Sequence, residues 1–315
     1  MRPIRLELSA VILALAERDG RLEPVVATTR VGGAADLPTT VFDPDAHRTL
    51  ELALRDWVAR SAGVSLGYVE QLYTFGDRAR GAPDAGAETP HTVSIGYLAL
   101  ARPQETAGAA IDWTPSGAFF PWEDRRGGGA SLVADVIAPR LPAWIAAAPE
   151  RRAERAALCF GLDGRPWRDE LALERLELLY GAGLTEEAWR DRGAAAPADL
   201  PRLGRPLPRD HRRILATGIG RLRGKLKYRP VLFELTPPAF TLLELQQAAE
   251  AVSGVQLHKQ NFRRQVARSG LVEPTGATST RHGGRPAAEY RYAPEATSER
   301  RAAARGGAGK TAVPG

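Results

Sequence analysis

Residues 257–270, LHKQNFRRQVARSG, carry three arginines, a lysine, two glutamines and an asparagine but no carboxylate. Wound as a helix at about 100° per residue, the segment places Phe262 and Val266 on one face, with His258 and Gln265 beside them. The opposite face suits a DNA major groove, because arginine pairs with guanine, and glutamine or asparagine with adenine. A solvated helix is the alternative, but such helices usually mix both signs of charge. The residues predicted to contact DNA are Lys259, Gln260, Asn261, Arg263, Arg264 and Arg268.

Further cations flank this segment on both sides. Arg281 and Arg285 lie in the glycine-rich stretch ATSTRHGGRP at 277–286, and Arg223, Lys225 and Lys227 end an upstream helical pattern. We predict that they contact phosphates, which fix the register of a protein on DNA without reading its sequence.

The helices and strands predicted around these cations follow a recognisable order. Asp210 precedes a helical pattern, and Thr241 with Glu244 forms a capping box that starts a second helix. Gly254 supplies a turn before the cationic helix, and two strand-like stretches, LVEPTG and AAEYRY, follow it. Helix, helix, turn, helix and hairpin is the order of a winged helix-turn-helix, predicted here over 209–295. Residues 296–315 are predicted to be a disordered basic tail.

The N-terminal part has the sequence pattern of a different kind of domain. Residues 4–31 contain two strand-like runs around the turn ERDG, a helical pattern ends at Gly63, and TVSIGYLALA at 92–101 is a further strand. This order predicts an α/β or α+β domain over 1–150. Residues 151–208 are predicted to be a helical connector that ends in an alanine- and proline-rich linker.

Charge divides the chain in the same way. Residues 201–315 contain 21 Lys and Arg against 8 Asp and Glu, whereas residues 1–200 contain 22 against 29. An acidic body joined to a basic final third favours a polyanionic partner, most simply nucleic acid.

Several functional classes are excluded by composition. The single cysteine, Cys159, excludes a disulfide framework and favours a core residue. The apolar N-terminal stretch is too short to span a bilayer, so we expect a soluble cytoplasmic protein with no membrane partner. RGGGA at 126–130 lacks the lysine of a phosphate-binding loop, and the five histidines lack metal-ligand spacing. We therefore predict no metal, no cofactor and no catalytic residue.

The stretch LRDWVARSAGVSLGYVEQLYTFGD at 54–77 resembles the Nudix-box helix and following strand of the Nudix-related transcriptional regulators of NAD metabolism. DHRRILATGIGRLRGKLKYRPVLFEL, FTLLELQQ, LHKQNFRRQV and GGRPAAEYRY resemble the same family, so that the resemblance covers nearly the whole chain. It implies a Nudix-like sandwich that senses ADP-ribose or a related nucleotide, followed by an operator-binding winged helix. It also implies a homodimer, since such modules read two half-sites about one DNA turn apart.

The Nudix box itself departs from the hydrolase pattern. Hydrolysis of a nucleoside diphosphate needs carboxylates that hold Mg²⁺ on the pyrophosphate. With the register fixed by Gly63 and Val64, Arg60 and Ser61 stand where the two metal-binding glutamates belong. A shift by one residue recovers an arginine at Arg55 but still leaves no metal pair. The box therefore predicts a binding domain without hydrolase activity.

Five residues are candidates for holding the nucleotide: Arg55, Asp77, Arg80, Tyr97 and Trp122. Asp77 and Arg80 border a long polar loop, where ligand sites often lie, and Trp122 could stack on adenine. Core packing is the alternative for both aromatic residues.

The sequence thus favours a regulator that binds double-stranded DNA. One alternative is a Mg²⁺-dependent ADP-ribose pyrophosphatase with a basic nucleic-acid-binding domain, and a third possibility is an RNA-binding module.

Overall fold

The computed structural model describes residues 3–64, 66–76, 91–102, 111–226, 230–281 and 286–293. The strands are β1 (Ile4–Arg18), β2 (Arg21–Val31), β3 (Ala34–Asp36), β4 (Thr39–Val41), β5 (Val69–Phe75), β6 (His91–Leu100), β7 (Asp112–Pro115), β8 (Ala239–Thr241), β9 (Val272–Ser279) and β10 (Ala287–Tyr292). The helices are α1 (Leu50–Ala62), α2 (Gly129–Leu132), α3 (Pro142–Ile145), α4 (Pro149–Phe160), α5 (Ala172–Gly181), α6 (Glu186–Arg190), α7 (His211–Leu226), α8 (Leu242–Ser253) and α9 (Lys259–Ser269), with short π and 3-10 turns between some of them.

A mixed sheet in the order β3-β2-β1-β6-β5 forms the body of the N-terminal part. The predicted hairpin over 4–31 is present, and it turns at Asp19 and Gly20, which both have positive φ as a tight two-residue hairpin requires. β1 lies between antiparallel β2 and parallel β6.

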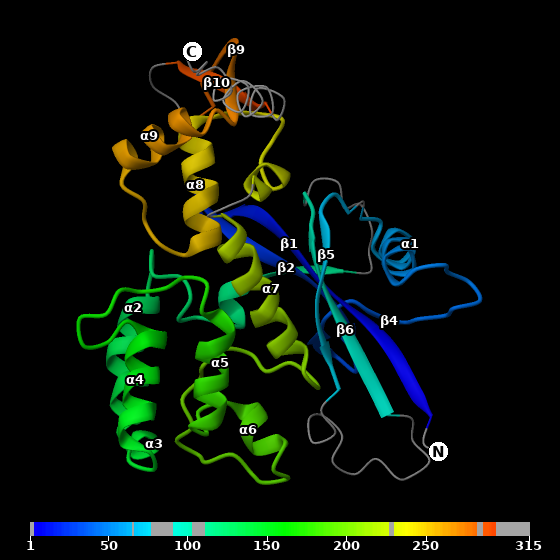
Figure 1. The fold of residues 1–315 in the computed structure, drawn as a ribbon, viewed down its shortest axis with the longest axis vertical. Helices are drawn as coiled ribbons and strands as arrows, with labels where there is room; N and C mark the ends of the chain where they lie inside the picture. Colours follow the sequence, from blue (N-terminus) through cyan, green and yellow to red (C-terminus); the bar gives the residue numbers. More distant parts are fainter. Residues whose placement is uncertain are drawn as a thin grey trace, which may run out of the picture.

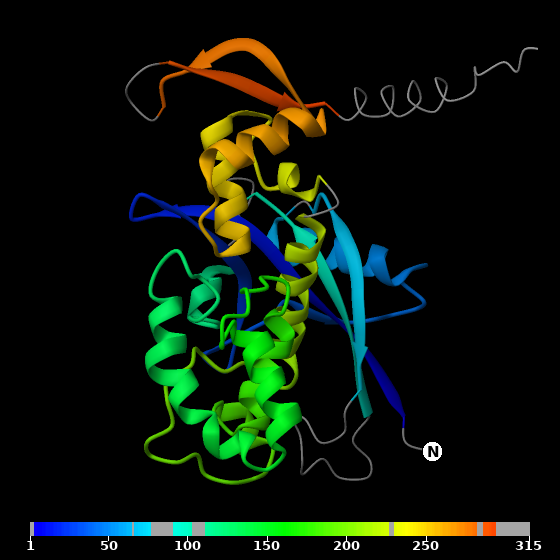
Figure 2. The same cartoon turned by 60° about the vertical axis from the view of Figure 1, so that its left-hand side comes forward.

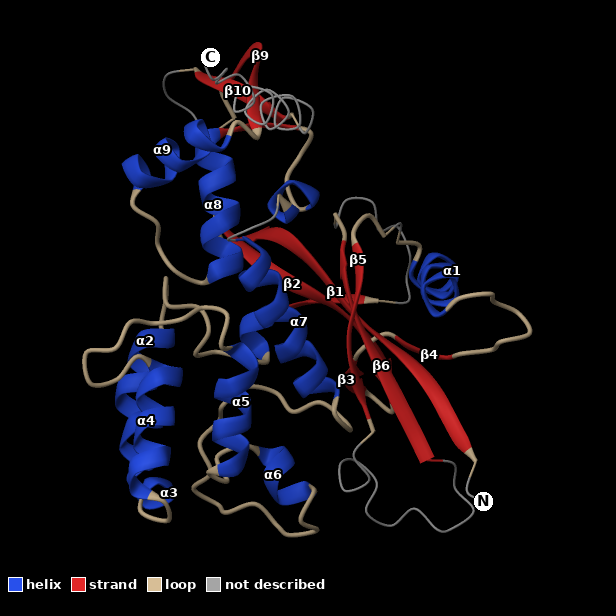
Figure 3. Ribbon diagram, viewed as in Figure 1, coloured by secondary structure: helices blue, strands red, loops and turns tan. Residues whose placement is uncertain are grey.

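The long strand β1 divides the core into two layers because its side chains alternate between the two faces of the sheet. Leu8, Ala10 and Ile12 pack with residues of α1, whereas Val11 and Leu13 pack with residues of α7. Helices therefore cover both faces, as Figures 1 and 3 show. The predicted α/β sandwich is confirmed, with α7 as its second helical layer.

The position of α7 corrects a prediction. The sequence placed this helix in the winged helix-turn-helix, but Ile214, Leu215 and Ile219 are buried with the core of the N-terminal sheet. Gly218 lies so close to the sheet that an added Cβ would come within 2.7 Å of the Val11 side chain. The predicted boundary at residue 209 therefore cuts through the sandwich, and the winged helix begins beyond α7.

The connector is a compact helical layer. α4 packs on α5, and α5 packs along α7 on the side away from the sheet. Its buried residues, among them Phe160 and Leu179, belong to the same apolar cluster as α7 and α8. Cys159 is buried within this cluster, as predicted. The connector and α7 thus share one continuous core.

The C-terminal part contains α8, α9 and the three-stranded sheet β8-β10-β9. Both hydrogen bonds of the predicted capping box at Thr241 and Glu244 are present. α8 ends at Gly254 and α9 ends at Gly270, each in the left-handed conformation that favours glycine. Figure 2 shows the two wing strands at the end of the molecule opposite the helical connector. In the described part of the chain no helix is long and apolar enough to cross a membrane.

Candidate DNA interface and the junction behind it

α9 presents the cationic face that its sequence predicts. Lys259, Gln260, Asn261, Arg263, Arg264 and Arg268 are all exposed, whereas Phe262 and Val266 are half-buried. No residue of the helix is fully buried. The helix is held by two apolar anchors, and its polar side chains remain open to a partner.

Among the described residues, the cations of α9 have no acidic partner. Arg264 donates a hydrogen bond of 2.8 Å from Nη2 to Oδ1 of Asn261, which orients its guanidinium. Among the described residues, Lys259, Arg263 and Arg268 make no ion pair and no side-chain hydrogen bond. No carboxylate in the described part of the chain compensates their charge, and such an exposed cationic face is what a nucleic-acid surface requires.

His258 and Gln265 do not pack as predicted, because both are exposed. His258 is the N-cap residue of α9, with φ −68° and ψ 116°, so it lies outside the helical winding that the prediction assumed. Its carbonyl oxygen accepts a hydrogen bond of 3.0 Å from the backbone of Phe262.

The wing arginine Arg281 is engaged within the protein. Its Nη2 donates to Oε1 of Glu289 at 2.8 Å, and its Nη1 lies 3.6 Å from Oε1 of Glu244. Because Glu289 is on β10 and Glu244 starts α8, Arg281 ties the wing to the helix-turn-helix. Arg285 lies outside the described residues.

The described upstream cations, Arg223 and Lys225, do not join α9. The side chain of Lys225 pairs with Glu70 of β5 at 3.0 Å, on the sandwich. Arg223 is buried, and Lys227 lies outside the described residues. The assignment of Lys225 and Arg223 to phosphate contacts was wrong, because α7 belongs to the sandwich.

Among the described nucleotide candidates, Trp122 lies apart from Tyr97, in the other apolar layer of the sheet. Arg55 donates to the carbonyl oxygens of Leu66 at 2.6 Å and Gly67 at 3.2 Å, so it fixes the loop after α1. Tyr97 is buried beneath α1, and burial raises its pKa. Asp77 and Arg80 lie outside the described residues.

Trp122 cannot stack on adenine because its side chain is fully buried, and its indole Nε1 donates to Oε1 of Glu123 at 2.9 Å.

The Nudix-box helix supports the register inferred from the sequence. Gly63 caps α1 in the left-handed conformation, and Val64 is buried. Arg60 pairs with Asp56 at 2.6 Å, and a hydrogen bond from His47 lowers the pKa of Asp56. In the described part of the chain no group of three or more His, Cys, Asp or Glu residues could hold a metal ion.

A buried ionic junction was missed by the sequence reasoning. The carboxylate of Glu123 accepts hydrogen bonds from Arg175 of α5, at 2.5 and 2.9 Å, and from Arg223 of α7. The side chains of Arg175 and Arg223 are 0% and 4% exposed, so neither is solvated by bulk water. Arg175 also lies 3.9 Å above the Trp167 ring. Burial alone would raise the pKa of Glu123, but the two arginines outweigh it and hold this pKa below its usual range.

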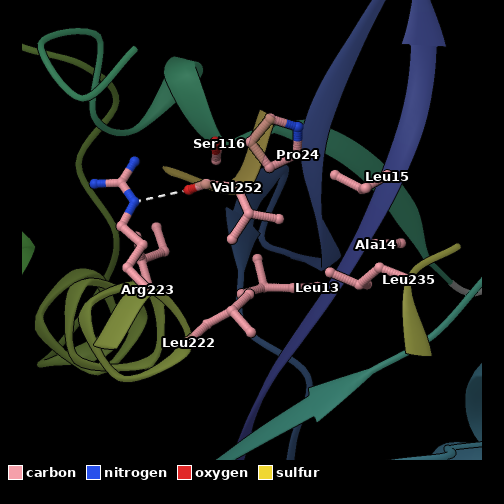
Figure 4. A pocket seen from close by; sticks show the side chains of 10 residues that line it. Leu13, Ala14, Leu15, Pro24, Ser116, Leu222, Arg223, Leu235 and Val252 are labelled. Atoms are coloured by element: carbon pink, nitrogen blue, oxygen red, sulfur yellow. Dashed lines mark hydrogen bonds between the residues drawn. The ribbon is translucent and has the colours of Figure 1, made fainter. Parts of the chain in front are cut away.

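The junction extends to the helix-turn-helix. Arg223 donates from Nε to the carbonyl oxygen of Val252, near the end of α8, at 2.8 Å, the contact drawn in Figure 4. The backbone N–H of Arg125 donates to the carbonyl oxygen of Gly254 at 2.8 Å. An added Cβ at Gly254 would lie 2.2 Å from the carbonyl oxygen of Glu123, so only glycine fits the turn between α8 and α9. Leu13, Leu222 and Val252 line the apolar seam beside these contacts.

A second buried polar cluster contains Ser9, Asp36 and His211, which are the residue types of a catalytic triad. Nδ1 of His211 contacts Asp36, and its Nε2 lies 3.5 Å from the hydroxyl of Ser9. Ser9 is fully buried, so no substrate reaches its hydroxyl. These side chains fix the start of α7 to the sheet, and Arg209 adds a salt bridge to Glu7.

Comparisons with known proteins agree with this arrangement. Residues 232–292 match the family model of the NrtR DNA-binding winged helix domain. The ADPR responsive transcriptional repressor NtrR of Acinetobacter baylyi is 42% identical over 84 residues, which are 27% of this chain and 33% of that protein. The chain thus matches one third of the length of this relative.

Two crystal structures share the fold over most of the chain. Shewanella oneidensis NrtR complexed with a 27mer DNA has a TM-score of 0.55 at 20% identity, over 93% of this chain and 95% of that chain. A second structure of Shewanella oneidensis NrtR has a TM-score of 0.53 at 22% identity, over 93% and 96%. The predicted order, an α/β sandwich followed by a winged helix, is confirmed: the fold of Shewanella oneidensis NrtR extends over most of the chain, and residues 232–292 match the NrtR DNA-binding winged helix domain.

Proposed function

We propose that this protein is a transcriptional repressor that binds operator DNA through α9 and is released by ADP-ribose or a related nucleotide. The proposal rests on the exposed cations of α9, which have no acidic partner among the described residues and lie within the segment that matches the NrtR winged helix. The response to ADP-ribose is proposed because the Acinetobacter relative is an ADPR responsive transcriptional repressor. The regulated genes are those of NAD metabolism, as the family resemblance implies.

The protein acts as a homodimer on a palindromic operator. One α9 from each copy enters the major groove of a half-site, and the half-sites lie about 34 Å apart, one turn of DNA. Arg263, Arg264 and Gln260 read bases, whereas Lys259 and Arg268 contact phosphates.

Nucleotide control works through linkage. A ligand that binds better to the DNA-free arrangement of the domains lowers operator affinity by the same factor as DNA lowers ligand affinity. The junction of Glu123, Arg175 and Arg223 supports this mechanism because it joins the sandwich, the connector and the end of α8 in one hydrogen-bonded cluster. A movement of α7 along the sheet therefore moves the helix-turn-helix with it.

The Nudix-like domain binds its nucleotide without cleaving it. Arg60 occupies a position where hydrolysis needs a metal-binding carboxylate, and its charge repels Mg²⁺. We expect no Mg²⁺-dependent turnover of ADP-ribose at high protein concentration. If hydrolysis of ADP-ribose co-elutes with the protein in gel filtration, the protein is a hydrolase instead.

The repressor proposal is tested by selecting bound sequences from a pool of random DNA duplexes with the full chain. We expect an enriched palindrome whose binding exceeds that of unrelated duplexes at every salt concentration of a series. The proposal fails if all sequences bind alike across the series, because non-specific cations produce only the salt-dependent part of the affinity. A preference for single-stranded RNA of the same sequence would favour an RNA-binding module.

A further inference from the structure

One side of α7 carries cations at regular spacing. Arg213, Arg221 and Lys225 follow one another at intervals of eight and four residues, so they lie in one row along the helix. All three are half-buried. α7 packs here beside β5, the edge strand of the sheet. The row of cations therefore runs along the sheet edge.

Each of these cations lies near an aromatic ring of β5 or of the residue before it. The distances from the charged group to the ring centroid are within about 6 Å, the range of a cation–π contact. The pairs are Lys225 with Tyr68 at 5.8 Å, Arg221 with Tyr73 at 5.7 Å and Arg213 with Phe75 at 5.9 Å. The helix and the strand are thus joined at three places along their length.

A β-bulge turns the rings toward α7. Gln71 pairs with Tyr97 and Thr74 pairs with Ile95, so β5 contains one residue more than β6 between these pairs. Such an extra residue reverses the alternation of side chains along a strand. Before the bulge, Gln71 faces the α1 layer, where it accepts a hydrogen bond from the hydroxyl of Tyr97. After it, the odd-numbered Tyr73 faces α7 instead.

Glu70 is the only carboxylate of β5 in this contact among the described residues. It pairs with Arg221 at 2.9 Å and with Lys225 at 3.0 Å, and it accepts a hydrogen bond from the hydroxyl of Tyr68 at 2.7 Å. Burial alone would raise the pKa of Glu70, but this hydrogen bond and the two cations outweigh it and hold the pKa below its usual range. The carboxylate is therefore charged at neutral pH and fixes the last turns of α7 to the sheet edge.

The start of β5 is fixed in turn by the Nudix-box helix. Arg55 of α1 donates to the carbonyl oxygens of Leu66 at 2.6 Å and Gly67 at 3.2 Å. The backbone N–H of Leu100 donates to the carbonyl oxygen of Tyr68 at 3.1 Å. Residues 66–68 are thus held by α1 on one side and by β6 on the other. A ligand that shifts α1 would shift the start of β5 with it.

The opposite side of the same turns of α7 contacts the helix-turn-helix. Arg223 lies between Arg221 and Lys225 in the sequence and points away from β5, toward Glu123 and the carbonyl oxygen of Val252 at the end of α8. The last turns of α7 are therefore bound to β5 on one side and to α8 on the other. Contacts between named side chains lead without a gap from α1 to α8.

We propose that Glu70 is the positioning residue that transmits nucleotide binding in the sandwich to the winged helix. This inference rests on the proposed function, since it supplies the route by which the effector acts on operator binding. In this role Glu70 contacts neither the nucleotide nor DNA. It makes the end of α7 follow the strand that α1 moves. Without its charge, α7 keeps its apolar packing on the sheet but no longer follows β5.

The test is the ratio of the operator dissociation constants with and without saturating ADP-ribose, measured by fluorescence anisotropy on the full-length chain. Glu70→Gln keeps the shape of the side chain and removes its charge. We expect the ratio to fall at least about twofold toward one, as for other substitutions within coupled networks. Operator affinity without nucleotide should stay that of the wild type. A merely structural role would lower the thermal unfolding midpoint and leave the ratio unchanged.

Glu177→Gln is the matched control. Glu177 pairs with Arg213 of the same helix at 2.8 Å, and its side chain is 22% exposed, against 20% for Glu70. It belongs to α5 and not to β5, so its substitution should leave the ratio at the wild-type value. Equal reductions in the two variants would show a general loosening of α7 and would overturn the role assigned to Glu70.

A second variant, Lys225→Gln, breaks the same contact from α7. It should also lower the ratio, and adding it to Glu70→Gln should lower the ratio no further, because both substitutions remove one interaction. If both single variants keep the wild-type ratio, the route through Glu70 is wrong while the repressor proposal stands. A wild-type ratio of one at saturating ADP-ribose would remove nucleotide control itself, and the route with it.

Discussion

Arginine has opposite roles in two regions of this molecule. At the junction, Arg175 and Arg223 are buried, and their guanidinium groups are saturated by Glu123 and by backbone carbonyl oxygens. On α9, Arg263 and Arg268 are exposed and have no acidic partner among the described residues. A saturated arginine fixes geometry, whereas an unsaturated one is available for a ligand. Pairing and burial, more than residue type, therefore separate scaffold from binding surface.

The largest effect is expected from Glu123→Gln at the junction. The substitution leaves two buried arginines without their anion, and breaking a buried pair in this way costs about 3–5 kcal/mol of the free energy of unfolding. Urea denaturation measures it. Glu154→Gln is the control, since that side chain is 71% exposed and should change stability by less than about 0.5 kcal/mol. Equal free energies of unfolding for the two variants would contradict the difference between buried, paired residues and exposed ones.

The glycine in the turn between α8 and α9 should show the next largest effect. Gly254 and Gly276 both have positive φ, but only at Gly254 would a Cβ strike another part of the chain. Both alanine variants should lose about 1–2 kcal/mol for the backbone conformation. Gly254→Ala should lose about 1–3 kcal/mol more from the clash. Similar unfolding free energies for the two variants would show that the turn is not seated on Glu123.

On α9 the expected effect is on binding and not on stability. Arg263→Ala should cost about 1–3 kcal/mol of operator affinity and relax the preference at one base position. Lys259→Ala should weaken all sequences alike and reduce the salt slope by about one. Both should unfold like the wild type, because neither side chain has a partner in the described structure. Identical changes in base preference would remove the distinction between base and phosphate contacts.

The smallest effect is a pH dependence of the junction. Because the folded pKa of Glu123 is lowered, its contribution to stability is fully present above its ordinary pKa of 4.5 and is lost as the pH falls through the folded value. Between pH 6 and pH 3 the wild type should lose more stability than Glu123→Gln, which cannot titrate there. Parallel pH curves of the unfolding free energy would contradict the lowered pKa.

Much of the fold of the C-terminal part could be predicted from local sequence signals. The capping box at Thr241, the terminal glycine Gly270 and the apolar pair on α9 depend on neighbours within a few residues, and the structure contains all three features. The charge excess of the last third was likewise a property of the sequence alone.

Long-range packing accounts for the errors. The periodicity of α7 revealed an apolar face but not that the face packs on the sheet, so Lys225 and Arg223 were given to DNA. Trp122 and Glu123 are residue types that often line ligand sites. They are buried here because Arg175 and Arg223 approach Glu123 from helices distant in the sequence.

Nucleotide binding and operator binding, as proposed, are coupled through one chain. The direct measurement is fluorescence anisotropy of a labelled, selected operator titrated with the full-length protein, with and without saturating ADP-ribose, paired with calorimetry of ADP-ribose on the free and the operator-bound protein. We expect ADP-ribose to lower operator affinity, and the operator to lower ADP-ribose affinity by the same factor. An operator affinity that does not change at saturating ADP-ribose would contradict it.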